Sequence, residues 1–147
     1  MMIKIHPTGF KLWFLLLLIS GTSKFLDIIE TNEYWVEYDR VLFFMTRRQV
    51  AASAVLLELG VAVYLVSRAC LLKKAYSLLW LSGILSTYKA GTWLLQDVRP
   101  CSCLGVVGRA LDLSAGQLEL VTSTMLLLMA VNSLVVIMLG RVAGKNT

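Results

Sequence analysis

Four long apolar runs constrain the fold of this chain more than any other feature of its sequence. They cover about residues 12–29, 50–66, 75–95 and 118–139. A helix needs roughly 20 mostly apolar residues to cross about 30 Å of hydrocarbon, and each run is close to that length. Charged residues make up only 16% of the chain, against about 25% in ordinary soluble domains. We therefore predict an all-α integral membrane protein, an antiparallel four-transmembrane-helix bundle, with residues 1–147 as a single domain.

The first apolar run also has the features of a secretory signal peptide. Lys4 and Lys11 precede it, and the small residues Gly21 and Ser23 follow its most apolar stretch, residues 12–19, at positions typical of a cleavage site. Against cleavage, the hydrophobic pattern continues as far as Ile29. The sequence leaves open whether residues 1–23 are removed.

Lysine and arginine residues predict the orientation in the membrane. The formal net charge is +5, and the basic residues flank the apolar runs without forming a basic–aromatic patch. We therefore expect a lipid bilayer as partner and no nucleic acid. The side of the membrane with the two termini and residues 67–74 has modestly more lysine and arginine than the other side. This excess places that side in the cytoplasm. The protein is then a multi-pass protein of the bacterial inner (cytoplasmic) membrane with both termini cytoplasmic, and residues 96–117 face the periplasm.

Cys101 and Cys103 form a Cys-x-Cys pair between Pro100 and Gly105, residues that indicate a loop. A disulfide across one residue closes a very small ring, and strained disulfides are easily reduced. Arg99 would favour a thiolate. We predict that this pair is catalytic in thiol–disulfide exchange, although the sequence leaves open whether the protein is an enzyme.

Two alternatives remain for the cysteine pair. Its thiols could be unreactive, or they could bind a soft metal such as Cu(I). No third metal ligand is evident and His6 is the only histidine, so we predict no metal site. Cys70 is expected near the opposite membrane face, where it cannot easily resolve the pair.

Four ionisable residues are predicted within the spans: Lys24, Asp27, Glu58 and Lys89. Such groups are costly in lipid, usually paired and often functional. At about 1.5 Å per residue, both lysines are ~9–10 Å below the outer ends of their helices. We expect a Lys–Glu–Lys cluster with Glu58 paired to Lys24 or Lys89. In the alternative, both lysines snorkel outward. A quinone site, a proton path and a structural pair all stay open.

Several of these segments resemble elements of the MauE/DoxX family of redox-associated membrane proteins. The segment from Gly21 to Lys24 resembles its G-x-x-K element, and Glu58-Leu59-Gly60 resembles its E-L-G element. Cys101-Ser102-Cys103-Leu104-Gly105 resembles the C-G-C-F-G motif of the MauE branch, with Ser102 in place of glycine and Leu104 in place of phenylalanine. The resemblance covers most of the chain.

The resemblance implies a redox-linked role in the membrane. In the MauE branch this role is maturation of the disulfide-rich small subunit of methylamine dehydrogenase. For this chain it suggests that Cys101 and Cys103 oxidise, reduce or mature a periplasmic partner, either a thioredoxin-like protein or a redox enzyme. The alternative, drawn from the DoxX branch, is a non-catalytic membrane subunit or scaffold of a quinone-linked oxidoreductase. A quinone is the candidate cofactor, and the client is not identified by the sequence.

Overall fold

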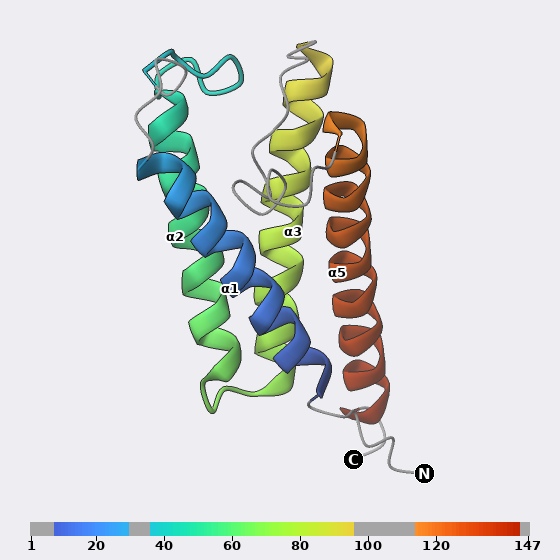
Figure 1. The fold of residues 1–147 in the computed structure, drawn as a ribbon. Helices are drawn as coiled ribbons and strands as arrows, with labels where there is room; N and C mark the ends of the chain where they lie inside the picture. Colours follow the sequence, from blue (N-terminus) through green and yellow to red (C-terminus); the bar gives the residue numbers. More distant parts are fainter. Residues whose placement is uncertain (1–7, 30–35, 96–113, 145–147) are drawn as a thin grey trace.

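The computed structural model describes residues 8–29, 36–95 and 114–144. Its four helices are α1 (Thr8–Ile29), α2 (Arg47–Val66), α3 (Leu71–Leu94) and α5 (Ala115–Gly144). Successive helices run in opposite directions, so α1 begins and α5 ends at the same end of the bundle (Figure 1). We call this the terminal end and the opposite one the loop end. The predicted all-α fold with four antiparallel helices is confirmed.

Three of the four helices are long and apolar enough to cross a membrane. These stretches are Gly9–Ile29, Arg47–Val66 and Gly116–Arg141. α3 has 24 residues, so it extends for about 36 Å at 1.5 Å per residue. Its serine, threonine, tyrosine and lysine residues make it less apolar than the others. The described chain is thus a multi-pass membrane protein in which the least apolar helix runs beside α2 and α5.

Each helix begins a few residues before the corresponding apolar run. The first turns contain polar residues, which hydropathy leaves out of the runs. Thr46 caps α2 in a capping box, in which its side chain accepts from the amide of Gln49 and the Gln49 side chain accepts from the Thr46 amide. Ser114 does the same for α5, because the Gln117 amide donates to its hydroxyl at 3.4 Å. Such caps satisfy amide groups that have no partner within the helix.

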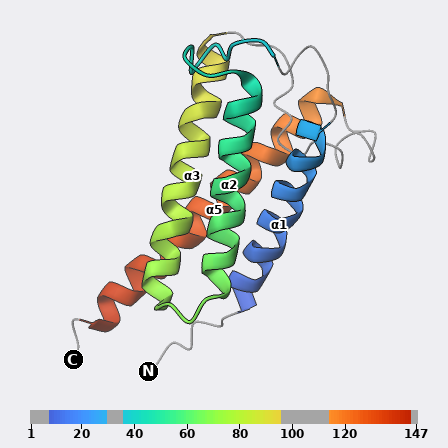
Figure 2. The ribbon, with the colours of Figure 1, turned by 90° about the vertical axis from the view of Figure 1, so that its left-hand side faces the viewer.

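The four helices pack as two pairs. α1 contacts mainly α2, and α3 contacts mainly α5, whereas α2 and α3 touch less and α1 has little contact with α5. In Figure 2, α5 slants across the bundle behind α2 and α3. The link between α2 and α3, residues 67–70, lies at the terminal end.

The hydrophobic core lies toward the terminal end of the bundle. It gathers residues from the first half of α1, the last part of α2, the first half of α3 and the second half of α5. Leu78 and Leu81 of α3 are fully buried at its centre. The core residues are Phe10, Trp13, Leu17, Val61, Ala62, Leu65, Ala75, Leu78, Leu81, Met129, Val136 and Ile137. The two helix pairs are therefore joined by close apolar packing at this end.

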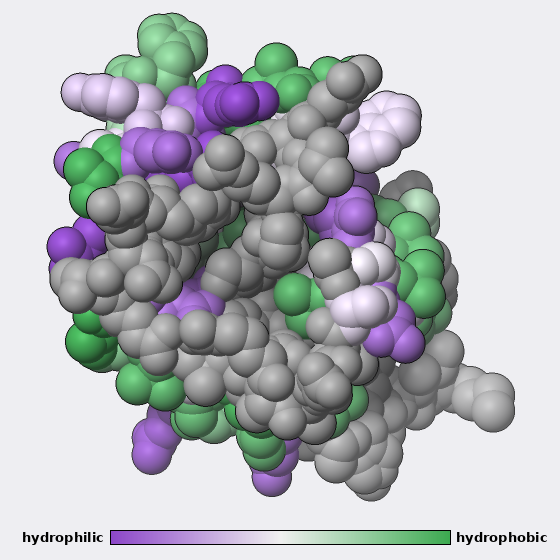
Figure 3. Space-filling model, turned by 45° about the horizontal axis from the view of Figure 1, so that its top comes forward, coloured by the Kyte–Doolittle hydropathy of each residue, from purple (hydrophilic) through white to green (hydrophobic). Residues whose placement is uncertain are grey.

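Residues 36–46 form a compact segment at the loop end. Asp39 is buried, and its Oδ1 accepts from the amides of Val41 and Leu42 at 2.9 and 2.8 Å. Its Oδ2 accepts from the Tyr88 hydroxyl at 2.6 Å, which ties the segment to α3. In the space-filling view of this end, hydrophilic side chains gather on the side of this segment and hydrophobic ones lie along the flanks (Figure 3).

Candidate functional site

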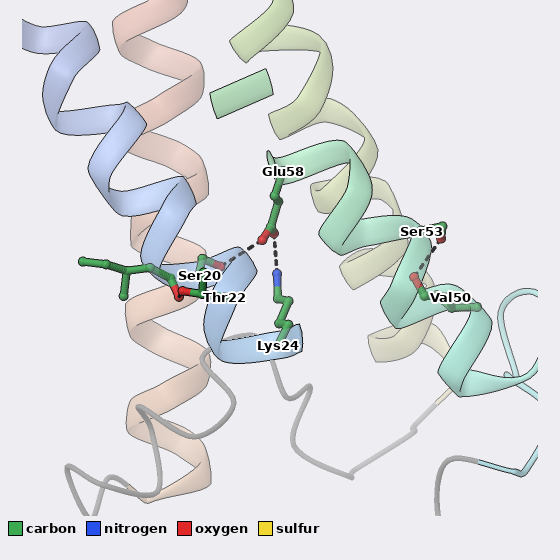
Figure 4. Close-up of polar contacts among 7 residues, drawn as sticks. Ser20, Thr22, Lys24, Val50, Ser53 and Glu58 are labelled. Atoms are coloured by element: carbon green, nitrogen blue, oxygen red, sulfur yellow. Dashed lines mark hydrogen bonds and ion pairs between the residues drawn. The ribbon is translucent and has the colours of Figure 1, made fainter. Parts of the chain in front are cut away.

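Lys24 of α1 and Glu58 of α2 form a buried ion pair. Lys24 Nζ donates to Oε1 of Glu58, and the Ser20 hydroxyl donates to Oε2 at 3.1 Å. Figure 4 shows both α1 side chains directed at the carboxylate. Glu58 is 2% exposed and Lys24 is 9% exposed. Both carboxylate oxygens thus have a donor in a place where water has little access, as a buried charge requires.

Gly21 allows α1 to approach α2 closely enough for this pair to form. A Cβ atom on Gly21 would lie 2.9 Å from Cδ2 and 3.1 Å from Cγ of Leu59. Leu59 is the neighbour of Glu58 in sequence, so the same contact fixes the position of the Glu58 carboxylate along the axis of α1. The segment from Gly21 to Lys24 and the Glu58-Leu59-Gly60 element, which are far apart in sequence, therefore form one contact between the two helices.

Lys89 is bound to α5 and not to the carboxylate of Glu58. Its Nζ donates to the carbonyl oxygen of Glu119 at 2.9 Å and to the hydroxyl of Ser123 at 2.6 Å. Each helix pair therefore has one lysine that ties its two helices together. Of the three charged residues in the predicted cluster, the structure pairs Lys24 with Glu58 and places Lys89 on the other helix pair.

A cavity of about 80 Å³ lies between the two helix pairs, and all three of these residues line it. Its walls are mostly apolar and come from all four described helices. The polar lining residues are Ser20, Lys24, Glu58, Tyr88, Lys89 and Thr122. Two ammonium groups and one carboxylate give this polar part a formal charge of +1. The cavity is concave, largely apolar and supplied with a few polar groups, which is the usual composition of a small-molecule site.

The predicted catalytic cysteines, Cys101 and Cys103, lie outside the described residues. The segment that contains them connects Leu95, after α3, to Ser114, before α5, and both of these residues lie at the loop end. Cys70 is the exposed N-cap residue of α3 at the terminal end. Cys70 is therefore separated from the ends of the cysteine segment by the length of α3. Among the described residues, no group of three or more His, Cys, Asp or Glu side chains could hold a metal ion.

Three residues of this region were not predicted from the sequence: Ser20, Asp39 and Tyr88. A signal existed for Ser20, because it precedes Lys24 by four residues and so lies on the same helix face. A weaker signal existed for Asp39, because aspartate often accepts from amides a few residues ahead in a turn. The bond between Asp39 and Tyr88 joins residues 49 positions apart and has no local signal.

Comparison with known protein families identifies a match over most of the chain. The family model described as "Methylamine utilisation protein MauE" matches residues 6–139. No curated protein and no solved structure matches the chain. The matched range covers most of the sequence and includes both elements that meet at the Lys24–Glu58 pair, as well as the Cys-x-Cys segment. The chain therefore belongs to the MauE family of methylamine utilisation proteins.

Proposed function

We propose that this protein serves methylamine utilisation as a membrane-embedded thiol–disulfide redox protein whose Cys101 and Cys103 act on a periplasmic partner. The observation that carries the proposal is the Cys-x-Cys pair within the family-matched range, in the segment that joins α3 to α5 at the loop end. Strained disulfides of this kind are labile and tend to be catalytic or regulatory.

The proposed step is an exchange between one disulfide and two thiols. A thiolate of the reduced member attacks the disulfide of the other and forms a mixed disulfide, which the second thiol then resolves. One S–S bond is lost as one is gained, so electrons and protons balance within the exchange. The client would be a thioredoxin-like protein or a redox enzyme of the periplasm.

Basic residues support an orientation in which the loop end faces the periplasm. Lys11, Arg68, Lys73, Lys74 and Arg141 lie in or beside the helix ends at the terminal end. An excess of lysine and arginine marks the cytoplasmic side. Both termini would then be cytoplasmic, and the cysteine segment would lie in a compartment where disulfides form and persist.

That orientation is tested by reporter fusions at Glu37, at Lys73 and after Thr147. We expect a periplasmic signal at Glu37 and cytoplasmic signals at the other two positions. A periplasmic signal after Thr147 would contradict the orientation.

The described cavity is poorly suited to methylammonium as a ligand. Its polar part has a formal charge of +1, and its one carboxylate, on Glu58, is already paired with Lys24 and Ser20. A cation placed there would meet a second ammonium group, from Lys89, in surroundings of low dielectric where like charges repel strongly. This supports a role in maturing the methylamine-oxidising machinery over a role in carrying the amine.

The proposal is tested by trapping the thiols in cells and by a double substitution, Cys101→Ser with Cys103→Ser. We expect reductant-dependent alkylation of both cysteines, and loss of methylamine-dependent growth in a strain that carries only the double variant. Cys70→Ser is the matched control and should grow normally. Thiols that stay reduced and unreactive in growing cells would refute exchange.

A second candidate function is that of a non-catalytic subunit or scaffold for a redox enzyme. It is favoured by exposed aromatic side chains at the loop end, since Tyr38, Phe43, Phe44 and Trp93 are all at least 65% exposed. Such side chains suit contact with a partner protein or with the membrane interface. Full growth and full assembly of the client in the double cysteine variant would favour this second function.

A further inference from the structure

The cavity between the helix pairs has an apolar part and a polar part arranged along the bundle axis. Trp13, Leu17 and Met129 line it and also belong to the hydrophobic core at the terminal end. The polar residues, among them Lys24 and Lys89, come from the halves of α1 and α3 nearer the loop end. We propose that this cavity binds an acyl chain with an anionic oxygen head group, with its head toward Lys89 and its chain along the apolar wall. This goes beyond the proposed function and does not depend on it.

The size of the cavity favours a chain over a ring. Its volume is about 80 Å³, roughly half of the approximately 150 Å³ void that accepts benzene in an engineered protein core. A quinone ring would therefore require side chains such as Met125 to move. A chain one carbon wide is narrower than a ring, so a short stretch of it would enter with less displacement. The flexible thioethers of Met125 and Met129 would adapt to such a chain.

The charge of the cavity favours an anionic head group. Lys24 is compensated by Glu58, whereas the acceptors for Lys89 among the described residues are a carbonyl oxygen and a hydroxyl, both neutral. An ammonium group at membrane depth is costly and usually paired. A carboxylate or phosphate oxygen beside Lys89 would place a negative charge next to the ammonium group and form a charge-assisted hydrogen bond.

The position of the cavity fits a molecule that comes from the bilayer. α1 and α5 both line the cavity and have little contact with each other, so the proposed route of entry is from the lipid between these two helices. The polar part lies toward the loop end and the apolar part toward the middle of the bundle. A lipid in the leaflet at the loop end has the same orientation, with its head outward and its chain toward the midplane.

Trp13 allows the occupant to be detected directly, because bromine atoms on a chain quench tryptophan fluorescence on contact. The variant for this test retains Trp13 and carries Trp35→Phe, Trp80→Phe and Trp93→Phe. A matched variant retains Trp80 alone, which is 58% exposed and is not part of the cavity wall. Both are studied in detergent micelles, and circular dichroism verifies their helical folding.

Three probes separate the possible sources of the chain: dibrominated stearate, its neutral methyl ester, and a phosphatidylglycerol with dibrominated chains. We expect saturable quenching of Trp13 by the free acid, by the phospholipid or by both, and only unsaturable quenching of Trp80. Saturation by the acid alone identifies a free fatty acid, and saturation by the phospholipid alone identifies a bilayer lipid. Equal quenching by the acid and its ester, or no saturation with any probe, would overturn the proposal.

Lys89→Gln tests the head-group contact, and Lys73→Gln on the same helix is its control. Loss of one charge-assisted hydrogen bond should raise the half-saturating concentration about ten-fold for Lys89→Gln and leave it unchanged for Lys73→Gln. Native mass spectrometry of the chain with all its tryptophans provides a measurement that does not depend on their replacement. Bound acidic lipid should be retained with Lys73→Gln and lost with Lys89→Gln, and equal retention in both would contradict the proposal.

Discussion

The ion pair between Lys24 and Glu58 gives the sharpest prediction about stability. Lys24→Met keeps the length of the side chain and removes its charge, so the Glu58 carboxylate remains with the Ser20 hydroxyl but without its ammonium partner. Because Glu58 is only 2% exposed, water cannot replace that partner. We therefore expect Lys24→Met to lower the free energy of unfolding substantially.

The magnitude follows from the burial of the pair. Removal of one partner from a buried ion pair costs about 3–5 kcal/mol, whereas replacement of both by apolar residues of similar volume is often neutral or stabilising. Glu58→Gln should cost less than Glu58→Ala, because the amide oxygen still accepts from one of the two donors, Lys24 or Ser20. Lys24→Met combined with Glu58→Met should recover most of the loss.

The assay is reversible unfolding in mixed micelles with increasing fractions of a denaturing detergent, followed by far-ultraviolet circular dichroism. Lys11→Met is the control, because Lys11 is exposed on the same helix. Lys24→Met and Glu58→Met are also measured singly. If the losses in the free energy of unfolding of these two variants simply add up in the double variant, the two residues are not a coupled pair. If the double variant is stable but cannot support methylamine-dependent growth, the pair has a functional role beyond structure.

Two further predictions concern how the helices and the segment 36–46 are held. Gly21→Val should destabilise the protein by about 1–3 kcal/mol through overpacking against α2. Gly9→Val is the control and should not, because a Cβ atom on Gly9 has no neighbouring atom within 4 Å. Equal unfolding curves for the two variants would contradict the close approach of α1 and α2. Tyr88→Phe removes a hydrogen bond to the Asp39 carboxylate, worth about 1.5–3 kcal/mol. It should speed tryptic cleavage after the exposed Arg40, and an unchanged cleavage rate would show that this bond does not hold the segment.

The number and order of the helices were predictable because apolar runs of sufficient length have few alternatives in lipid. Their bounds were less predictable. The run at 50–66 starts at Val50, but α2 starts three residues earlier at Arg47. Hydropathy identifies the part of a helix that prefers lipid, whereas the helix itself extends as far as its caps allow. The capping box at Thr46 therefore decides a boundary that hydropathy does not indicate.

The charged residues of the site were predictable by type, since ionisable groups at membrane depth are rare and usually paired. Their partners were not, because pairing depends on how each helix is rotated. The sequence left Glu58 two possible lysines. Gly21 brings α1 to within contact of Leu59 and so delivers Lys24 to the carboxylate. Lys89 faces α5, where the carbonyl oxygen of Glu119 accepts from it.

The apolar core joins the two helix pairs toward the terminal end, and this determines where the pairs can separate most easily. Two polar contacts at membrane depth act within the helix pairs, Lys24 to Glu58 in one and Lys89 to Ser123 in the other. The core residues that join the pairs lie toward the terminal end, as does the short link at 67–70. Nearer the loop end the described helices enclose a cavity instead. Because regions with few buried apolar contacts open at lower free energy than packed cores, separation of the two pairs should begin at the loop end, where the segment carrying Cys101 and Cys103 joins α3 to α5.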